Sequence, residues 1–198
     1  VKPELDENFF KQFGLEENDL DLFKTKVRGN MDKELVQAVK QRVSTQVMDG
    51  LLATHDIDVP RAPVEREIER LRHETVQRYG GSYKIDPSLL PLEMFEAQAV
   101  RRVTLGLLVN ALVEEESVEV DDERVKEKME EMASSYEDPK QLIEFFNKDE
   151  QQQNQIRSMV LEEQVVDLLL ARAVVEEKTM SYEEVLKSLQ PEDASATD

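Results

Sequence analysis

Residues 49–71 read DGLLATHDIDVPRAPVEREIERL, and this stretch decides the fold because it ends one helix and begins another. Upstream of it, apolar residues recur at steps of three or four, which predicts one helix over residues 20–54, about 50 Å long at 1.5 Å per residue. Pro60 pushes Val59 out of helical geometry, and Pro63 suits the first turn of a second helix. We therefore expect the chain to leave the long helix at this turn.

The composition predicts an all-α fold. The 198 residues are 39% hydrophobic and 35% charged, with only six Gly, no Trp and many helix-forming Leu, Glu, Lys, Gln and Arg residues. The chain has no Cys, which excludes disulfides, thiolate metal sites and a cysteine nucleophile, and which fits a reducing compartment. The longest nearly apolar run, residues 103–113, is shorter than the roughly 20 residues that span a bilayer. The missing initial Met predicts a fragment excised from a longer protein.

The negative charge is concentrated in the second part of the chain. The net charge is −19; residues 1–113 carry 16 basic and 19 acidic groups, whereas residues 114–198 carry 9 and 25. Nucleic acids bind proteins largely through Lys and Arg at phosphates, and anionic membranes also attract basic groups. We therefore expect neither a nucleic acid nor a membrane as a direct partner.

Start and stop signals predict further helices along the chain. Asp121 and Asp138 are suitable N-caps, the latter followed by a first-turn proline, and Ser181 with Glu184 forms a capping box. Gly80 and Gly81 are expected to end the second helix. The helices expected besides residues 20–54 cover residues 6–13, 63–79, 92–115, 122–135, 139–147, 151–173 and 182–190.

The residues that carry most enzyme chemistry form no recognisable constellation. His55 and His73 have no evident serine partner, and neither has a Glu three residues before it, as a helical di-metal site requires. The acidic runs at residues 114–116 and 121–123 lack the alternating ligands and central Gly of a calcium loop, and no glycine-rich phosphate loop is present. We predict no active site, no metal and no cofactor.

Apolar residues crowd into residues 129–146, MEEMASSYEDPKQLIEFF, around a proline turn. Two short helices cannot bury so many large side chains between themselves, and an apolar patch rimmed by charge marks an interaction site. A pair of thin amphipathic helices also has no second layer to cover its flank. The candidate residues of this patch are Met129, Met132, Tyr136, Leu142, Ile143, Phe145 and Phe146.

Short strings spread over nearly the whole chain resemble the C-terminal, substrate-binding domain of trigger factor, a family of bacterial chaperones that meet nascent chains at the ribosome. Each string alone is weakly specific, but they occur together and in order. They are PELD at residues 3–6, FG at 13–14, IDVP at 57–60, RYGG at 78–81, LPLEMFEAQAVRR at 90–102, LGLL at 105–108, MASSYEDPK at 132–140, IEF at 143–145 and EEQ at 162–164.

The resemblance implies an elongated all-helical body with two projecting arms that hold unfolded polypeptide, in the bacterial cytoplasm. It implies a body with a long spine helix over residues 1–58, a first arm over 59–118, a second arm over 119–172, a return helix over 173–190 and a disordered tail over 191–198. The substrate-contacting positions that it implies are Leu71 and Tyr79 on the first arm and Met132, Tyr136, Leu142 and Phe145 on the second.

The family's prolyl isomerase domain and its ribosome-docking Gly-Phe-Arg loop have no counterpart in these residues. The resemblance therefore implies that isomerase activity and ribosome docking belong to the parent protein, and that this chain is not itself an enzyme. We expect an ATP-independent chaperone domain that binds unfolded or nascent polypeptides. The alternatives are a helical adaptor for one folded partner and, less in keeping with the residues, a carboxylate metalloenzyme. Exposed arms also make the pairing of two copies a candidate property.

Overall fold

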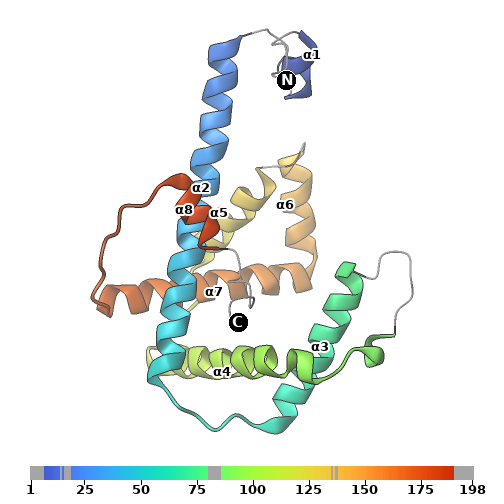
Figure 1. The fold of residues 1–198 in the computed structure, drawn as a ribbon, viewed down its shortest axis with the longest axis vertical. Helices are drawn as coiled ribbons and strands as arrows, with labels where there is room; N and C mark the ends of the chain where they lie inside the picture. Colours follow the sequence, from blue (N-terminus) through green and yellow to red (C-terminus); the bar gives the residue numbers. More distant parts are fainter. Residues whose placement is uncertain are drawn as a thin grey trace, which may run out of the picture. The chain divides into compact units, whose positions relative to one another are not determined.

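The computed structural model describes residues 7–13, 15, 19–79, 86–134, 136 and 138–189, and every regular element within them is a helix (Figure 1). The predicted all-α class is confirmed. The glycines expected to end the second helix and the expected tail over residues 191–198 lie outside the described residues. The elements are α1 (Glu7–Gln12), α2 (Leu20–Thr54), α3 (Arg61–Tyr79), the 3-10 helix η1 (Pro87–Leu89), α4 (Glu93–Glu115), α5 (Asp122–Ala133), α6 (Pro139–Lys148), α7 (Glu150–Arg172) and α8 (Tyr182–Lys187).

The break predicted between the first two long helices is confirmed. Helix α2 has 35 residues and ends at Thr54, whose hydroxyl donates to the carbonyl of Gly50 at 2.8 Å. Residues 55–60 are not helical, and α3 begins at Arg61, two residues before the proline expected at its start. Pro63 still lies in the first turn, where a backbone N–H has no partner within the helix, so the proline costs no hydrogen bond there.

The chain divides into two compact units, Val1–Thr45 with Glu176–Asp198 and Gln46–Val175, so that α2 contributes to both. In the first unit, the rings of Phe9, Phe10 and Phe13 pack around Phe23 of α2 with centroid distances of 5.0–6.0 Å. Edge-to-face packing of this kind adds to the energy of apolar burial. It fixes the six-residue α1 against the start of α2, although α1 is too short to be stable alone.

Helix α8 belongs to the same unit and is shorter than expected. The predicted capping box is present: the Ser181 hydroxyl accepts from the backbone N–H of Glu184, whose carboxylate accepts from the N–H of Ser181 at 2.7 Å. The helix begins at Tyr182 and ends at Lys187, and residues 174–181 before it are extended and mostly exposed. A return helix was expected over residues 173–190; of its described residues, 173–189, only Tyr182–Lys187 belong to α8, because the capping box starts the helix at Ser181.

In the second unit, α4 packs across α3 around a small apolar core (Figure 1). This core joins Ile68 and Leu71 of α3 to Phe95 and Ala99 of α4, with Val64 and Leu90 packed against it. Arg102 of α4 bridges to Glu67 of α3 at 3.2 Å, and Arg101 bridges to Asp49 at the end of α2 at 2.5 Å. Helix α7 also contacts α4, but parts of α4 stay uncovered, since Val100 and Leu107 are 38% and 37% exposed.

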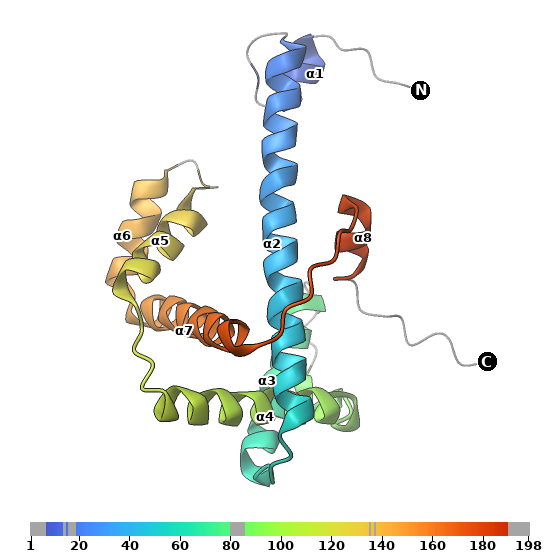
Figure 2. The ribbon, with the colours of Figure 1, turned by 90° about the vertical axis from the view of Figure 1, so that its left-hand side faces the viewer.

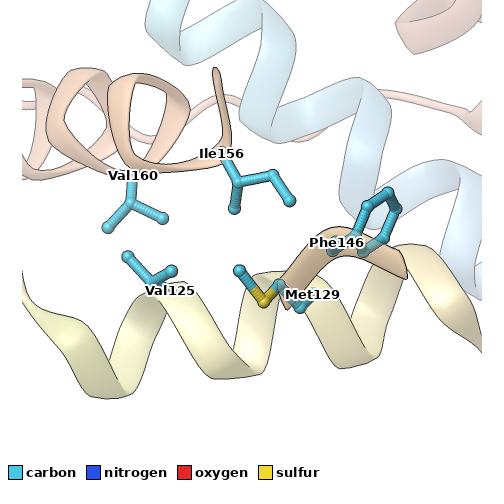
Figure 3. Close-up of a cluster of buried hydrophobic side chains, with 5 residues drawn as sticks. All are labelled: Val125, Met129, Phe146, Ile156 and Val160. Carbon is cyan, nitrogen blue, oxygen red and sulfur yellow. The ribbon is translucent and has the colours of Figure 1, made fainter. Parts of the chain in front are cut away.

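Helices α5, α6 and α7 form the second helix group of this unit, with α5 and α6 side by side against one end of α7 (Figure 2). The N-caps Asp121 and Asp138 are confirmed, and Asp149 caps α7, which starts one residue earlier than expected. Figure 3 shows the core of the group: Ile156 and Val160 of α7 face Val125 and Met129 of α5, and Phe146 of α6 closes one end.

Candidate functional site

The candidate site lies where α5 turns into α6, and we call Met132, Tyr136, Leu142 and Phe145 the elbow surface. Helix α6 carries large apolar side chains at four of ten positions, including the adjacent Phe145 and Phe146. Neighbours in a helix point about 100° apart, so one face cannot bury both rings. Phe146 enters the core, whereas Phe145 stays 52% exposed.

The elbow surface borders an open hollow of about 540 Å³ that is lined by Tyr136, Asp138, Gln141, Leu142 and Phe145. The backbone there is fixed by hydrogen bonds. The N–H of Tyr136 donates to the carbonyl of Ala133 at 3.0 Å, and the Asp138 carboxylate accepts from the N–H of Gln141 at 3.1 Å. Tyr136 has its side chain largely in solvent, since the residue is 62% exposed.

The floor of the elbow surface is continuous with the core behind it. Met132 and Leu142 are half-buried and pack against the core of α5, α6 and α7. A hollow with apolar and aromatic walls on a rigid base can take an apolar side chain out of water, which is favourable in proportion to the area buried. Its aromatic rings add contact area at low cost in conformational entropy.

Two other residues of the predicted patch serve as its support. Met129 and Phe146 are each only 6% exposed and belong to the core itself. Their side chains hold α5 and α6 together beneath the elbow surface and offer almost no area to a bound molecule. Ile143 is half-buried on α6.

On helix α3, which packs against α4, the two residues predicted to contact a bound polypeptide have opposite environments. Leu71 is 4% exposed and lies in the core between α3 and α4, whereas Tyr79 at the end of α3 is 77% exposed. Three apolar residues that the sequence reading did not single out are also exposed: Leu89, Leu92 and Met94 at 75%, 47% and 68%. The signal for them was the run LLPLEM at residues 89–94, in which a proline interrupts four apolar positions that no single helix face could bury.

A buried arginine, also missed, holds this exposed run in place. Arg72 of α3 is 8% exposed; its guanidinium donates to the carbonyls of Ser88 and Leu90 at 2.8 and 2.7 Å and pairs with Glu69 at 2.8 Å. Of these three acceptors, Glu69 lies on α3, Ser88 lies in η1 and Leu90 follows η1 directly. Arg72 therefore fixes η1 against α3 and, through it, the exposed Leu89.

Charged pairs lie between the apolar areas on both helix groups. A hydrogen bond from Arg70 is the main reason that the pKa of Glu67 lies below its ordinary value, with Arg102 acting in the same direction. On the second group, Arg124 meets Asp167 and Lys128 meets Glu163, both at 2.7 Å, and Arg157 meets Asp122 at 2.6 Å. These three pairs connect α5 to α7 along their exposed sides.

Two further properties concern the residues that the structure describes. Among them, no three His, Asp or Glu side chains gather into a group that could hold a metal ion. None of the described helices combines the length and the apolar character that crossing a membrane requires.

This architecture defines a class of protein: an all-helical domain made of helix pairs, with aromatic and aliphatic side chains exposed near the ends of the pairs. A family model described as bacterial trigger factor protein (TF) C-terminus matches residues 19–171. The chain therefore belongs to the trigger factor family, in its C-terminal region.

Three curated relatives give the extent of the similarity. The trigger factors of Pseudomonas savastanoi pv. phaseolicola and Pseudomonas syringae pv. syringae are each 52% identical to the chain over 188 residues, which are 95% of this chain and 43% of the relative. The trigger factor of Pseudomonas putida strain KT2440 is 52% identical over 187 residues, which are 94% of this chain and 42% of the relative. The chain thus spans less than half the length of the curated relatives that it matches.

Proposed function

We propose that this chain is the polypeptide-binding domain of a molecular chaperone, which holds unfolded or nascent chains without ATP and so assists their folding. The observation that carries the proposal is the elbow surface, where Tyr136 and Phe145 are exposed beside an open hollow on a rigid helical base. Membership of the trigger factor family supports the same function.

The two helix groups of the second unit act as the two arms in this proposal. The first arm, residues 59–118, offers Tyr79 and the exposed run at residues 89–94; the second arm, residues 119–172, offers the elbow surface. Each area is small, so a single contact is weak. Several contacts made by one flexible chain give useful affinity together, because each later contact is intramolecular. Because each contact is weak and breaks on its own, the bound chain can be released without a nucleotide.

Within this proposal, eight of the nine residues expected at the site have one of two roles. Tyr79, Met132, Tyr136, Leu142 and Phe145 contact the bound chain, whereas Leu71, Met129 and Phe146 support these contacts from the cores. The net charge of −19 favours solubility of the empty arms.

The remaining parts of the proposal concern the whole protein. We infer that the longer protein also carries a prolyl isomerase and a ribosome-docking segment outside these residues, and that it works in the bacterial cytoplasm. Pairing of two copies through their exposed arm surfaces also belongs to the proposal. Sedimentation of the chain over a range of concentrations tests this pairing directly.

The binding surface is tested by removing its two exposed rings. The double variant Tyr136→Ser with Phe145→Ser should suppress the aggregation of a chemically unfolded test protein several-fold less well, while helical content stays unchanged. The control is Val174→Ser with Val175→Ser, which removes two side chains that are also exposed, at 96% and 62%, but far along the chain from the elbow. Full activity of the ring variant would falsify the assigned surface.

Unrelated unfolded proteins distinguish the chaperone from a helical adaptor. Titration of several labelled unfolded chains of different sequence should give broad, weak and competing binding. Saturable binding to one folded partner alone, with no affinity for the unfolded chains, would favour the adaptor instead.

A further inference from the structure

The two arms are joined by one short linker between α4 and α5, and its backbone has a defined path. Helix α4 ends at Glu115, Ser117 adopts a left-handed conformation with φ 51°, and residues 118–121 are not helical before α5 begins. Figure 2 shows this segment as an extended stretch between the two helices. Helix α4 also contacts α7 directly, so the direction of α4 relative to the second arm depends on this packing and on what holds the linker.

Two kinds of contact hold the end of the linker nearest α5: Val120 packs against the core of α5, α6 and α7, and Gln164 of α7 binds the backbone on either side of it. The Gln164 amide nitrogen donates to the carbonyl of Glu119 at 3.0 Å, and the Gln164 amide oxygen accepts from the N–H of Asp121 at 3.0 Å. A neighbouring β-strand would satisfy an extended backbone in the same two-point way. Because both bonds come from one planar amide, they restrict the rotation of residues 119–121 as well as their position.

A second contact holds the other end of the linker to the same helix. The guanidinium of Arg172 donates two hydrogen bonds to the Glu116 carboxylate, both at 2.6 Å. Glu116 caps the end of α4, and Arg172 is the last residue of α7. This pair is solvent-exposed on the arginine side, so it is weaker than its geometry suggests.

Helix α7 is a firm base for these contacts because the two turns before Gln164 are packed on α5. Ile156 and Val160 are 1% and 0% exposed in the shared core, and Glu163, next to Gln164, pairs with Lys128 of α5 at 2.7 Å. The string EEQ at residues 162–164 therefore has two separate uses. Its second residue attaches α7 to α5, and its third attaches α7 to the linker.

We propose that Gln164 is a positioning residue that sets the angle between the two arms, and with it the separation of their exposed apolar areas. The effect on binding rests on the function proposed above, whereas the effect on the angle does not. Contacts made in several places by one chain strengthen binding only when their spacing is held within reach of that chain. Freeing the linker should widen the range of spacings and lower affinity for chains that engage both arms.

Spin labels can measure the arm spacing because the chain has no cysteine of its own. The substitutions Arg78→Cys at the end of α3 and Lys140→Cys near the start of α6 place one label at an exposed position on each arm. The distance distribution is then recorded for the unsubstituted Gln164 and for two variants. Gln164→Glu replaces the donor nitrogen by a charged oxygen, and Gln164→Met removes both hydrogen bonds without adding charge.

The matched control is Gln155→Glu, which adds the same charge at an exposed position of the same helix. We expect both Gln164 variants to broaden the distance distribution, with no change in the control and no loss of helical content. Using two variants guards against a general effect of charge, and circular dichroism of each variant identifies any failure to fold. Distributions that stay as narrow as in the control would overturn the proposal.

Affinity for an unfolded test protein is measured on the same samples. We expect the Gln164 variants to bind about fivefold more weakly than the control, because the two areas no longer act together. A broadened distribution with unchanged affinity would overturn the part of the proposal that concerns binding. If the unsubstituted chain bound no unfolded protein, the proposed function would fail while the distance result still tested the role of Gln164.

Discussion

Arg72 donates a hydrogen bond from Nε to the backbone carbonyl of Leu90, which lies 18 residues further along the chain, at 2.7 Å. The contact places a charged group beside the small core between α3 and α4, where the residue is 8% exposed. Burying a charge is costly unless all of its hydrogen bonds are satisfied, and here two carbonyls and one carboxylate satisfy it. The exposed run at residues 89–94 is thus anchored through backbone atoms, so its side chains remain free for contact.

Arg72→Met should therefore lower the free energy of unfolding of the second unit by about 2–3 kcal/mol, as expected when hydrogen bonds to a charged group are lost. Arg70→Met on the same helix is the control. Arg70 is 57% exposed and pairs only with Glu67 and Glu74 nearby on α3, so its loss should cost less than about 1 kcal/mol. Urea unfolding followed by circular dichroism gives both values. Equal losses in the two variants would contradict the anchoring role of Arg72.

Ser117→Gly should stabilise the second unit by about 1 kcal/mol, because Ser117 has φ 51°, where any side chain is strained. Its N–H and that of Val118 donate to the carbonyls of Glu114 and Val113, which is the usual ending of a helix at a left-handed residue. Thermal unfolding should show the gain. Ser134→Gly is the control and should lower the unfolding temperature, because Ser134 has φ −60° and ordinary helical geometry. A lower unfolding temperature for Ser117→Gly would count against this account.

Much of the helical framework could be predicted because its signals are local. The turn at residues 57–60, the caps Asp121 and Asp138 and the capping box at Ser181 each depend on a few neighbouring residues. Asp149 escaped notice because the Gln-rich run after it lacks an apolar period from which to locate a helix start. Local chemistry fixes where helices begin, and the exact end residues depend on weaker preferences.

The environment of each candidate residue could not be predicted, because it depends on which helix lies opposite. The family resemblance assigns Leu71 and Tyr79 the same role, but only the presence of α4 against α3 makes Leu71 buried and leaves Tyr79 exposed. The same holds for Arg72, whose acceptors are carbonyls of a segment 16 and 18 residues away. Backbone carbonyls carry no sequence signal, so such a partner cannot be identified from residue types.

The docking of α8 should weaken at alkaline pH. The Tyr182 hydroxyl donates to the Glu34 carboxylate of α2, and this hydrogen bond is the main reason that the pKa of Tyr182 is raised above 10.0. A raised pKa means that the folded state favours the neutral phenol. The stabilisation is therefore fully present below about pH 10 and is lost as the pH rises through the folded pKa.

Ultraviolet titration of tyrosine ionisation tests this expectation. Tyr182→Phe should remove a component that titrates above pH 10, and Glu34→Gln should move that component toward the ordinary value. The two single variants thus report on the two partners of one hydrogen bond. A titration curve that Glu34→Gln leaves unchanged would show that the carboxylate does not perturb Tyr182.

The adjacent rings Phe145 and Phe146 should separate binding from stability. Phe146 is 6% exposed among Met129, Ile156 and the other core residues, so Phe146→Ala should cost about 3–5 kcal/mol of unfolding free energy. Phe145 is 52% exposed, so Phe145→Ala should cost less than about 1 kcal/mol. Denaturant unfolding of the two variants gives the comparison.

Binding of an unfolded test protein should be weakened more by Phe145→Ala than by Phe146→Ala. It is measured well below the denaturant concentration at which each variant unfolds. Phe145→Ala removes one wall of the hollow directly and should weaken aggregation suppression while the fold is retained. Phe146→Ala should weaken it only to the extent that α6 loses its place on α5 and α7, which the loss of helical content or cooperativity would reveal. If Phe145→Ala left suppression intact and Phe146→Ala abolished it with the fold preserved, the contact surface would have to lie on the other face of α6.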